Sequence, residues 1–443
     1  MTYFKDLGLS AAILSALDAK GYHTPTPIQV QSIPALIEGR DLCGIAQTGT
    51  GKTAAFALPS IMRLTANPVQ RRPLSCRMLV LSPTRELAAQ IAQSFKDYSK
   101  GQKLVTECVF GGVPINRQIA ALRPGVDVLV ATPGRLLDLI DQRAVSLKHV
   151  EIFVLDEADQ MLDLGFINAL KRIDGMLPKQ RQSLFFSATM PKSIADLGAR
   201  FLNDPVKVSV APQSTTAERV DQHVIFVNQK EKPALLSVVL KREPIDRALV
   251  FTRTKHGADK VVRQLHATDL PCAAIHGNKS QAQRTQALEA FRKGQIKILI
   301  ATDIAARGID VSGVSHVINF ELPNVPEQYV HRIGRTARAG AEGVAISFVD
   351  GEERGYLKQI ERLTRVQLEP MALPDDFAQL VASLPKPAPQ VRPTNTGRGG
   401  GRGAATAGAG RAAPEGERKR FYNPNKKPGA PGAHKGAVRR TGR

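Results

Sequence analysis

A glycine-rich segment near the amino terminus has the residue types that hold a polyphosphate. Residues 46–53 read AQTGTGKT, and glycines in such a loop let backbone N–H groups approach phosphate oxygens. Lys52 would reach the β- and γ-phosphates, and the Thr53 hydroxyl would coordinate Mg²⁺. Ala46 stands where the usual pattern has glycine, a change that is tolerated if its φ is negative. The segment predicts binding of a nucleoside triphosphate; the alternative is a Gly/Thr-rich turn between a strand and a helix.

Two adjacent carboxylates follow an apolar run further along the chain. Asp156 and Glu157 come directly after residues 152–155, which read IFVL. A carboxylate at the end of such a strand holds Mg²⁺ in nucleotide hydrolases, and a neighbouring glutamate can orient and deprotonate the attacking water. The alternative is a pair of acids that stabilises a helix N-terminus. The phosphate-binding loop in the same half of the chain favours the catalytic interpretation.

Short β-rich apolar runs alternate with longer helical stretches from about residue 40 to residue 350. This alternation predicts parallel α/β domains. The expected strands are 78–81, 126–130, 152–155, 184–186, 249–251, 273–275, 298–300, 317–319 and 344–348. Polar residues follow several of these runs directly. Because open parallel sheets bind ligands at the carboxyl ends of their strands, we expect the functional side chains there.

A weak internal repeat indicates that one α/β domain occurs twice. Three matches lie at similar offsets: 129–132 with 299–302 (offset 170), Thr84-Arg85 with Thr252-Arg253 (168), and Gly111-Gly112 with His276-Gly277 (165). Residues 203–218 are rich in Pro, Ser, Thr and Gln, and they are expected to leave the first copy and form a linker. The predicted division is a leading region 1–30, domains 31–212 and 213–370, and a tail 371–443.

The charge balance favours a polyanionic partner. The chain of 443 residues has a formal net charge of +21, and the segment from residue 386 to residue 443 has fourteen Lys and Arg with two acids. Nucleic acid is the first expectation and an anionic membrane the second. The tail is rich in Gly, Ala, Pro and Arg, so it is predicted to be largely disordered.

Other features point to a soluble protein of a reducing compartment. The four cysteines (Cys43, Cys76, Cys108 and Cys272) have no metal-ligand spacing, and buried free thiols are expected. The first residues lack the apolar stretch of a signal peptide, and no run approaches the roughly 18 apolar residues of a membrane span. We therefore expect a cytoplasmic location without a membrane partner.

Residues 156–159 read Asp-Glu-Ala-Asp, and the chain resembles the DEAD-box ATP-dependent RNA helicases that are named for this sequence. The resemblance extends in order from Phe4 to about Phe348. It implies two tandem RecA-like parallel-sheet domains of the P-loop NTPase class (helicase superfamily 2), with ATP and Mg²⁺ as cofactors. It also implies RNA-stimulated ATP hydrolysis that drives local, non-processive unwinding of RNA duplexes or remodelling of ribonucleoprotein. Within the family, residues 250–258, 274–280 and 321–327 resemble the bacterial RhlE type.

The resemblance assigns roles around the nucleotide. Gln29 would read the adenine edge and Phe4 would stack on the ring. Thr48, Gly49, Thr50 and Gly51 would surround the phosphates, and Asp310 would contact the ribose. Arg335 and Arg338 would reach the γ-phosphate as arginine fingers. The residues that would couple hydrolysis to unwinding are Asp159, Ser187, Thr189 and His331.

RNA contacts are likewise implied by the resemblance. The expected residues are Pro83, Thr84, Arg85, Gly112, Thr132, Gly134 and Arg135 in the first domain, and Thr252, Arg253, Gln281, Arg284 and Thr302 in the second. Hydroxyl, guanidinium and glycine N–H groups suit contacts to phosphate and 2′-OH, which are independent of base sequence. Single strands and short duplexes are therefore the expected ligands, and ribosomal precursors or RNA-decay complexes are the expected settings.

Two other functions fit part of the pattern. A DNA translocase could share the fold, but the residues around Gln29 and the sequences at 156–159 and 187–189 favour RNA. An RNA-annealing protein with a vestigial ATPase would need a broken catalytic residue, and none of the proposed catalytic residues is substituted.

Overall fold

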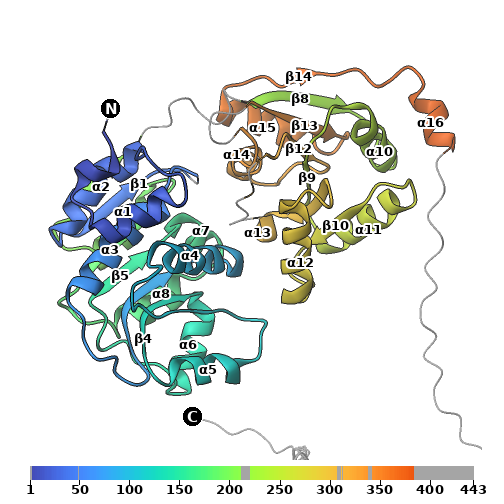
Figure 1. The fold of residues 1–443 in the computed structure, drawn as a ribbon. Helices are drawn as coiled ribbons and strands as arrows, with labels where there is room; N and C mark the ends of the chain where they lie inside the picture. Colours follow the sequence, from blue (N-terminus) through green and yellow to red (C-terminus); the bar gives the residue numbers. More distant parts are fainter. Residues whose placement is uncertain are drawn as a thin grey trace, which may run out of the picture. The chain divides into compact units, whose positions relative to one another are not determined.

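The computed structural model describes residues 2–47, 49–210, 220–306, 311, 313–337 and 342–383. The described chain forms two parallel sheets of seven strands each (Figure 1). The strand orders are β3-β4-β2-β5-β6-β1-β7 and β10-β11-β9-β12-β13-β8-β14. The predicted class of two tandem parallel α/β domains is confirmed.

The first domain has seven strands and ten helical segments within its described residues. Its strands are β1 (Leu42–Ile45), β2 (Cys76–Leu81), β3 (Thr106–Val109), β4 (Val126–Ala131), β5 (Ile152–Leu155), β6 (Gln182–Ser187) and β7 (Val206–Ser209). Its helices are η1 (Phe4–Leu7), α1 (Ala11–Asp18), α2 (Pro27–Ile37), α3 (Lys52–Ala66), α4 (Arg85–Tyr98), α5 (Ile115–Leu122), α6 (Pro133–Asp141), α7 (Ala158–Asp163), α8 (Ile167–Asp174) and α9 (Lys192–Phe201).

The second domain repeats this plan. Its strands are β8 (Val220–Phe226), β9 (Ala248–Thr252), β10 (Cys272–Ile275), β11 (Ile298–Thr302), β12 (His316–Asn319), β13 (Gly343–Val349) and β14 (Glu369–Pro370). Its helices are α10 (Lys232–Arg242), α11 (Lys255–His266), α12 (Gln281–Arg292), α13 (Asp303–Ala306), α14 (Pro326–Ile333), α15 (Arg354–Thr364) and α16 (Phe377–Ser383).

Both faces of the first sheet are buried, because successive side chains of a strand point to opposite faces. Met78 and Val80 of β2 belong to the core that α1 to α4 cover. Leu79 and Leu81 belong to the core on the other face, under α6 to α9. The second sheet is covered in the same way, with α10, α11 and α16 on one face and α12 to α15 on the other.

The internal repeat is real, but only one of its three matches has the correct register. Strand pairing places Ala131 of β4 opposite Leu81 of β2, and Ala301 of β11 opposite Phe251 of β9. These pairs give an offset of 170 at the ends of both strands, so the counterpart of Thr84 is Thr254 rather than Thr252. Both of these threonines cap the following helix with their side chains. The glycine match is likewise one residue out of register, since Val109 corresponds to Ile275.

All nine expected strands lie within observed strands, and the missed ones are short or polar. One of them corrects the linker prediction: β7 lies within residues 203–218 and pairs with β1 at the edge of the sheet. Residues 211–219 lie outside the described residues. In the segment predicted as tail, α16 packs on the second core, and Asp376 pairs with Arg242 at 2.6 Å. The tail from residue 384 lies outside the described residues.

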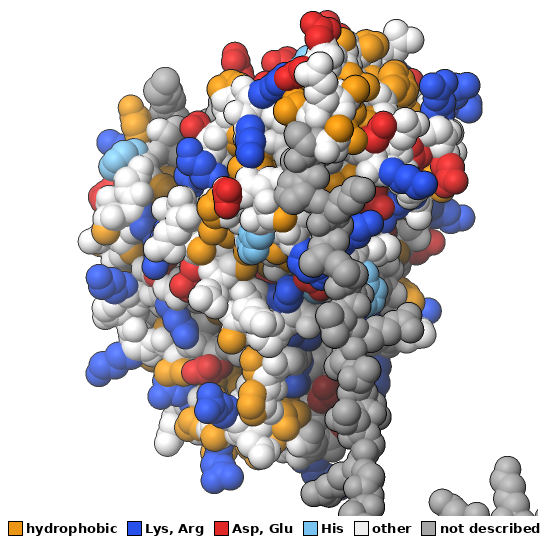
Figure 2. Space-filling model, turned by 90° about the vertical axis from the view of Figure 1, so that its right-hand side faces the viewer, with side chains coloured by type: hydrophobic (Ala, Val, Ile, Leu, Met, Phe, Trp, Pro, Cys, Tyr) orange, Lys and Arg blue, Asp and Glu red, His pale blue; other side chains and the backbone are white. Residues whose placement is uncertain are grey.

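The structure agrees with the expectation about the cysteines. All four cysteines are free thiols, and three of them are buried. Across the described residues, no helix is long and apolar enough to cross a membrane. Lys and Arg side chains are spread among Asp and Glu over the face of the molecule shown in Figure 2.

Candidate nucleotide site and nucleic-acid interface

The phosphate-binding loop follows β1 and ends where α3 begins. Gly49 and Gly51 have φ values of +85° and +90°, a left-handed conformation that favours glycine. Lys52 is the first residue of α3, and its side chain is 6% exposed. Its Nζ donates to the carbonyl oxygen of Ala46 at 2.9 Å and lies 3.9 Å from Glu157 Oε1. This single short contact leaves ammonium protons for a phosphate group.

Gln29 of α2 ties the amino-terminal region to this loop. Its Oε1 accepts a hydrogen bond from the backbone N–H of Thr26 at 2.9 Å, and its Nε2 donates to the carbonyl oxygen of Gly51 at 3.1 Å. A Cβ at Gly51 would lie 2.4 Å from that Nε2, so only glycine permits the contact. The amide keeps one N–H and one lone pair, the groups that an adenine edge requires.

Phe4 is packed into the first domain. Its side chain is 4% exposed and belongs to the hydrophobic core of the first domain with Leu7 and Ile28. Its role in stacking on the adenine ring stays a prediction. Two aromatic residues of the amino-terminal region are exposed, Tyr3 at 44% and Tyr22 at 48%, and Tyr22 lies seven residues before Gln29. Sequence reasoning assigned no role to either tyrosine.

The carboxylates lie beside the loop at the end of β5. Asp156 and Glu157 are each 2% exposed. Burial raises the pKa of Asp156 to about 7; Lys52 opposes the shift and Glu157 adds to it. Glu157 has a left-handed φ of +55°, which costs about 1–3 kcal/mol and is typical of functional sites. Its side chain accepts a short hydrogen bond from Gln160 Nε2 on α7.

The side chains beside the loop fit a magnesium ion. Asp156 Oδ1 is a buried oxygen with no hydrogen-bond partner, a cost that a cation would remove. Thr53 lies half-buried at the start of α3. Within the described residues, no group of three or more His, Cys, Asp or Glu could hold a metal by itself. Mg²⁺ typically uses one or two protein ligands together with phosphate oxygens and waters, which matches this set.

Asp159 connects the acidic strand end to β6. Its Oδ2 accepts hydrogen bonds from the backbone N–H groups of Ala188 and Thr189 at 3.1 Å each, and from Thr189 Oγ1 at 3.2 Å. Ser187 is the last residue of β6, and its buried hydroxyl has no partner. These hydrogen bonds link the acidic strand end directly to the segment after β6. The three predicted coupling residues of the first domain are in contact or adjacent.

The predicted RNA-binding residues of the first domain follow three neighbouring strands. Pro83, Thr84 and Arg85 follow β2, Gly112 follows β3, and Thr132, Gly134 and Arg135 follow β4. Gly112 has a φ of +82°, and a Cβ there would lie 2.0 Å from Arg85 Nη1. The close approach of Arg85 therefore requires glycine. Pro83, Thr84 and Thr132 are buried, so the guanidinium groups of Arg85 and Arg135 and the exposed Gly112 and Gly134 make up the accessible part of this set at the carboxyl edge.

Arg135 has a structural contact that the sequence did not indicate. Its Nη1 donates to the carbonyl oxygen of Val113 at 3.2 Å and to Gln118 Oε1 at 2.9 Å. Gln118 Nε2 donates to the carbonyl oxygen of Phe110 at 3.0 Å. Arg135 and Gln118 together hold the turn that contains Gly112. Sequence reasoning missed Gln118 because a single glutamine on a helix carries no signal.

Two predicted RNA-binding residues of the second domain differ sharply in exposure. Thr252 is 0% exposed, and its hydroxyl donates to the carbonyl oxygen of Thr254 at 3.2 Å. Its hydroxyl is thus bonded within its own turn, and a contact between Thr252 and RNA stays a prediction. Arg253 is partly exposed, and its Nη2 lies 3.3 Å from the buried carboxylate of Glu353. Its backbone N–H donates to Glu321 Oε2 at 2.7 Å.

Other predicted residues of the second domain lie at the ends of strands or helices. Thr302 ends β11, and Gln281 and Arg284 lie one turn apart at the start of α12. Arg335 follows α14, and its Nε donates to the carbonyl oxygen of His331 at 3.1 Å. His331 and Arg335 line the same small hollow as Asp303. The predicted residues Thr48, Asp310 and Arg338 lie outside the described residues.

Arg332 is a buried residue with a structural role beside the predicted arginine fingers. It is 1% exposed, and its Nε and Nη2 donate to the two carboxylate oxygens of Asp303 at 2.6 and 2.8 Å. Its guanidinium also lies 5.0 Å from the centre of the Phe251 ring. Arg332 therefore fixes α14 against β9 and α13, which positions His331 and Arg335. Sequence reasoning singled out the arginine cluster but assigned no role to this member.

Family comparison matches most of the described chain. The model of the DEAD/DEAH box helicase family matches residues 26–197, and that of the helicase conserved C-terminal domain matches residues 214–340. The ATP-dependent RNA helicase CshA of Listeria monocytogenes is 43% identical over 374 residues, which cover 84% of this chain and 71% of that protein. The CshA of Geobacillus kaustophilus is 42% identical, with 84% and 79% covered. These relatives are named CshA, so they do not support the expected RhlE type.

Solved structures agree with this comparison. Saccharomyces cerevisiae Dbp5 bound to RNA and ADP BeF3 matches with a TM-score of 0.73 and 31% identity, covering 86% of this chain and 98% of that one. Mss116p bound to single-stranded RNA and AMP-PNP matches with a TM-score of 0.75 and 27% identity, covering 87% and 83%. Both similarities span the two sheet domains.

Proposed function

We propose, from the premise that this chain belongs to the DEAD-box family of ATP-dependent RNA helicases, that its first domain holds the phosphates and Mg²⁺ of the nucleotide. Lys52 and the glycine loop bind the phosphates, and Thr53 and Asp156 hold the Mg²⁺. The observation that carries this assignment is the unpartnered, buried Oδ1 of Asp156 beside the loop. Bound Mg²⁺ would neutralise phosphate charge. Lys52 supplies a second positive charge from the protein.

Glu157 is the proposed general base. Its carboxylate lies 3.9 Å from Lys52 Nζ and is oriented by Gln160. A carboxylate in this place can align a water with the γ-phosphate and accept its proton. Asp159 then links the strand end to Ala188 and Thr189, so that loss of the γ-phosphate reaches the segment after β6.

Base recognition is assigned to Gln29 and Tyr22. Gln29 has the free amide groups that adenine requires, and Tyr22 offers an exposed ring close by in the sequence. Guanine presents a carbonyl oxygen where adenine presents an amino group, so this pair would favour ATP over GTP.

RNA binding uses the carboxyl edges of both sheets. Arg85, Gly112 and Arg135 form the surface in the first domain, and Arg253, Gln281 and Arg284 form it in the second. Contacts to phosphate and sugar support binding that does not depend on base sequence. The structures of Dbp5 and Mss116p contain RNA together with a nucleotide or analogue, which supports a state in which both ligands are bound.

Arg335 and Arg338 would complete the site from the second domain. Arginine contacts of this kind are worth about 10³–10⁵ in rate in other nucleotide hydrolases. The predicted setting remains the cytoplasm, with ribosomal precursors or RNA-decay complexes as possible substrates. The RNA helicase names of the bacterial relatives support the RNA substrate but name no pathway.

The decisive experiment compares nucleic acids as activators. The purified chain should hydrolyse ATP slowly alone and much faster with single-stranded RNA, and it should unwind a short RNA duplex. DNA of the same sequence and length should stimulate weakly. Equal stimulation by DNA would favour the DNA translocase, and the absence of any ATPase would favour the annealing protein.

A further inference from the structure

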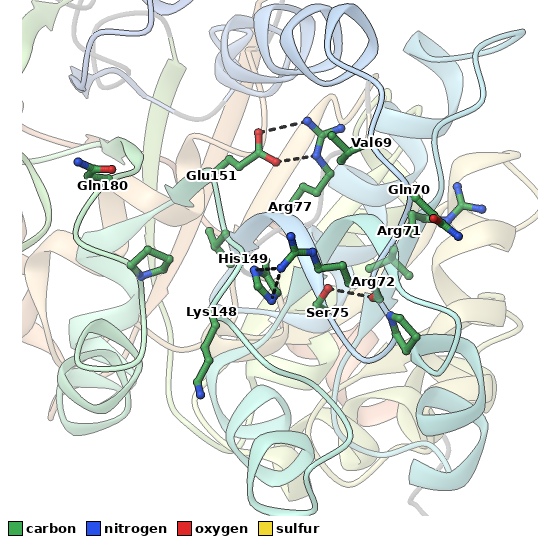
Figure 3. Close-up of a pocket in the computed structure, with 14 residues that line it drawn as sticks. Val69, Gln70, Arg71, Arg72, Ser75, Arg77, Lys148, His149, Glu151 and Gln180 are labelled. Atoms are coloured by element: carbon green, nitrogen blue, oxygen red, sulfur yellow. Dashed lines mark hydrogen bonds and ion pairs between the residues drawn. The ribbon is translucent and has the colours of Figure 1, made fainter.

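A hollow of the first domain lies at the edge of the sheet opposite to the nucleotide-binding loop. It has a volume of about 760 Å³, and we call it the amino-edge pocket (Figure 3). Its lining residues are Val69, Gln70, Arg71, Arg72, Pro73, Ser75, Arg77, Val126, Lys148, His149, Val150, Glu151, Pro178 and Gln180. They lie at or just before the starts of β4, β2, β5 and β6, which are neighbours in the sheet. The candidate site residues that follow these strands lie at the opposite, carboxyl ends of the strands.

The charges in the amino-edge pocket do not balance. Four of its side chains are cationic (Arg71, Arg72, Arg77 and Lys148), and Glu151 is the one acid among the lining residues. Arg77 is buried and donates through two nitrogens to Glu151, so the charges of these two residues neutralise each other. Arg71 lies 3.3 Å from Asp127, outside the lining. Two of the four cations are therefore neutralised.

Arg72 and Lys148 remain without an acidic partner in the described part of the chain. Arg72 Nη1 lies 3.2 Å from both ring nitrogens of His149, a group that is neutral or itself a cation. Lys148 is exposed, and its ammonium group contacts no described side chain in an ion pair. Figure 3 shows Arg72, His149 and Lys148 on the same side of the pocket. An anion bound here would accept hydrogen bonds from Arg72 and Lys148.

We propose that the amino-edge pocket is a second RNA contact, which binds the phosphodiester backbone of RNA that extends beyond the carboxyl edge. The proposal rests on the RNA helicase function described above. The pocket contains no Trp, Tyr, Phe, Leu, Ile or Met, and its side chains without an acidic partner are cations, which favours a polyanion over a protein partner. The lining instead offers guanidinium, ammonium, imidazole and amide groups, which bind phosphate.

The distance of the amino-edge pocket from the carboxyl edge means that only an RNA longer than the carboxyl-edge site can contact both. Strands of four to six residues span about 13–20 Å at roughly 3.3 Å per residue, which separates the two edges of the sheet. A strand of about 8 nucleotides is about 27 Å long at 3.4 Å per nucleotide, whereas about 30 nucleotides span about 100 Å. Because part of the short RNA lies along the carboxyl edge, the remainder is too short to cross the sheet and enter the pocket, whereas the longer RNA can occupy both.

The test compares these two lengths on the full chain. The double variant Arg72→Ala/Lys148→Ala changes two exposed side chains, so folding should be preserved. Its matched control is Lys96→Ala/Lys171→Ala, which removes two exposed lysines that do not line the pocket. Affinity for both RNAs is measured over a range of salt, together with the ATPase rate at saturating short RNA.

The proposal predicts a length-dependent defect. The pocket variant should bind the long RNA about tenfold more weakly at low salt, and its slope of log affinity against log salt should flatten by about 1.4 for two lost phosphate contacts. Short-RNA affinity and ATPase rate should match those of the wild type and the control. Unchanged affinity for the long RNA would overturn the proposal, as would an equal loss for both lengths.

A competition arm separates the possible sources of the anion. Poly-L-glutamate and inorganic phosphate are each titrated against the complex with long RNA, in the wild type and the pocket variant. If the variant loses binding of poly-L-glutamate or phosphate but keeps full affinity for long RNA, the pocket takes an acidic peptide or free phosphate, and the RNA assignment is overturned. A failure of RNA to stimulate the wild-type ATPase would instead overturn the helicase function itself.

Discussion

The carboxyl edges of the two sheets have the same arrangement of strands and helices, but the lysines at one equivalent position have different partners. Lys52 starts the helix after β1, and Lys232 starts the helix after β8, the equivalent strand of the second sheet. Lys52 has a carbonyl at 2.9 Å and a carboxylate at 3.9 Å. Lys232 is 1% exposed and is paired directly with the buried carboxylate of Glu353, with Asp350 at 3.2 Å.

In the second domain, Glu353 and Asp350 therefore neutralise the ammonium group of Lys232. In the first domain, the phosphates of the nucleotide would neutralise the equivalent group of Lys52. Glu353 also binds Arg253, an RNA-binding candidate, and accepts from the backbone N–H of Leu322 at 3.0 Å. The difference teaches how a duplicated domain can lose one ligand and keep another. Where the first domain has its nucleotide-binding loop, the second has an internal ion network that contacts Arg253, a predicted RNA-binding residue.

The strand-end glutamates should show the largest difference between the two domains. Glu157→Gln should lower RNA-stimulated turnover by about 10²–10⁴, because glutamine cannot accept the proton of the attacking water. ATP binding should persist, and the variant should stay bound to RNA in ATP. Glu321, the equivalent residue after β12, is the matched control. Single-turnover hydrolysis measures both, and near-normal turnover by Glu157→Gln would place the base elsewhere.

The buried lysine of the second domain should matter to stability rather than to nucleotide binding. Lys232→Ala removes the buried cation shared by Asp350 and Glu353 and leaves Glu353 with Arg253 alone, which costs about 3–5 kcal/mol in free energy of unfolding. Lys230→Ala, an exposed neighbour, should change it little. Denaturant unfolding of both variants gives the comparison. A loss below about 1 kcal/mol for Lys232→Ala would show that the network is not what stabilises this edge.

Magnesium binding should depend on pH because of Asp156. Its raised pKa of about 7 means that the carboxyl is partly protonated at neutral pH, and a metal ion must displace that proton. Apparent affinity for Mg²⁺ should thus fall about tenfold from pH 8 to pH 6 and be nearly constant above pH 8. Titration of Mg²⁺ in the presence of an ATP analogue measures it. An affinity that rises on acidification would contradict the assignment of Asp156.

The smallest effect is expected where an arginine is held by a neutral side chain. Gln118→Ala should weaken RNA binding about three- to tenfold by releasing Arg135 and the turn around Gly112. Arg135→Ala should weaken it by a similar factor, and the double variant should be no worse than either single one. Additive losses in this cycle would show that Gln118 acts independently of Arg135.

Much of the fold followed from the sequence because apolar runs and strand-end polar residues are local signals. The nine expected strands are all present, and Lys52, Asp156 and Glu157 meet as expected. The burial of single side chains could not be predicted from local sequence. Phe4 is covered by the core and Thr252 by its own turn. The register of the repeat, the edge strand β7 and helix α16 depend on pairing and packing between distant segments, which short sequence matches do not encode.

The central claim is that the chain holds one nucleotide, in its first domain. Calorimetric titration of the full chain with a non-hydrolysable ATP analogue and Mg²⁺ tests it, with Lys52→Ala as the comparison. The account predicts one nucleotide per chain for the wild type and affinity lowered by at least about thirtyfold for Lys52→Ala, from the loss of one charged contact. Two nucleotides per chain, or undiminished binding by Lys52→Ala, would contradict it.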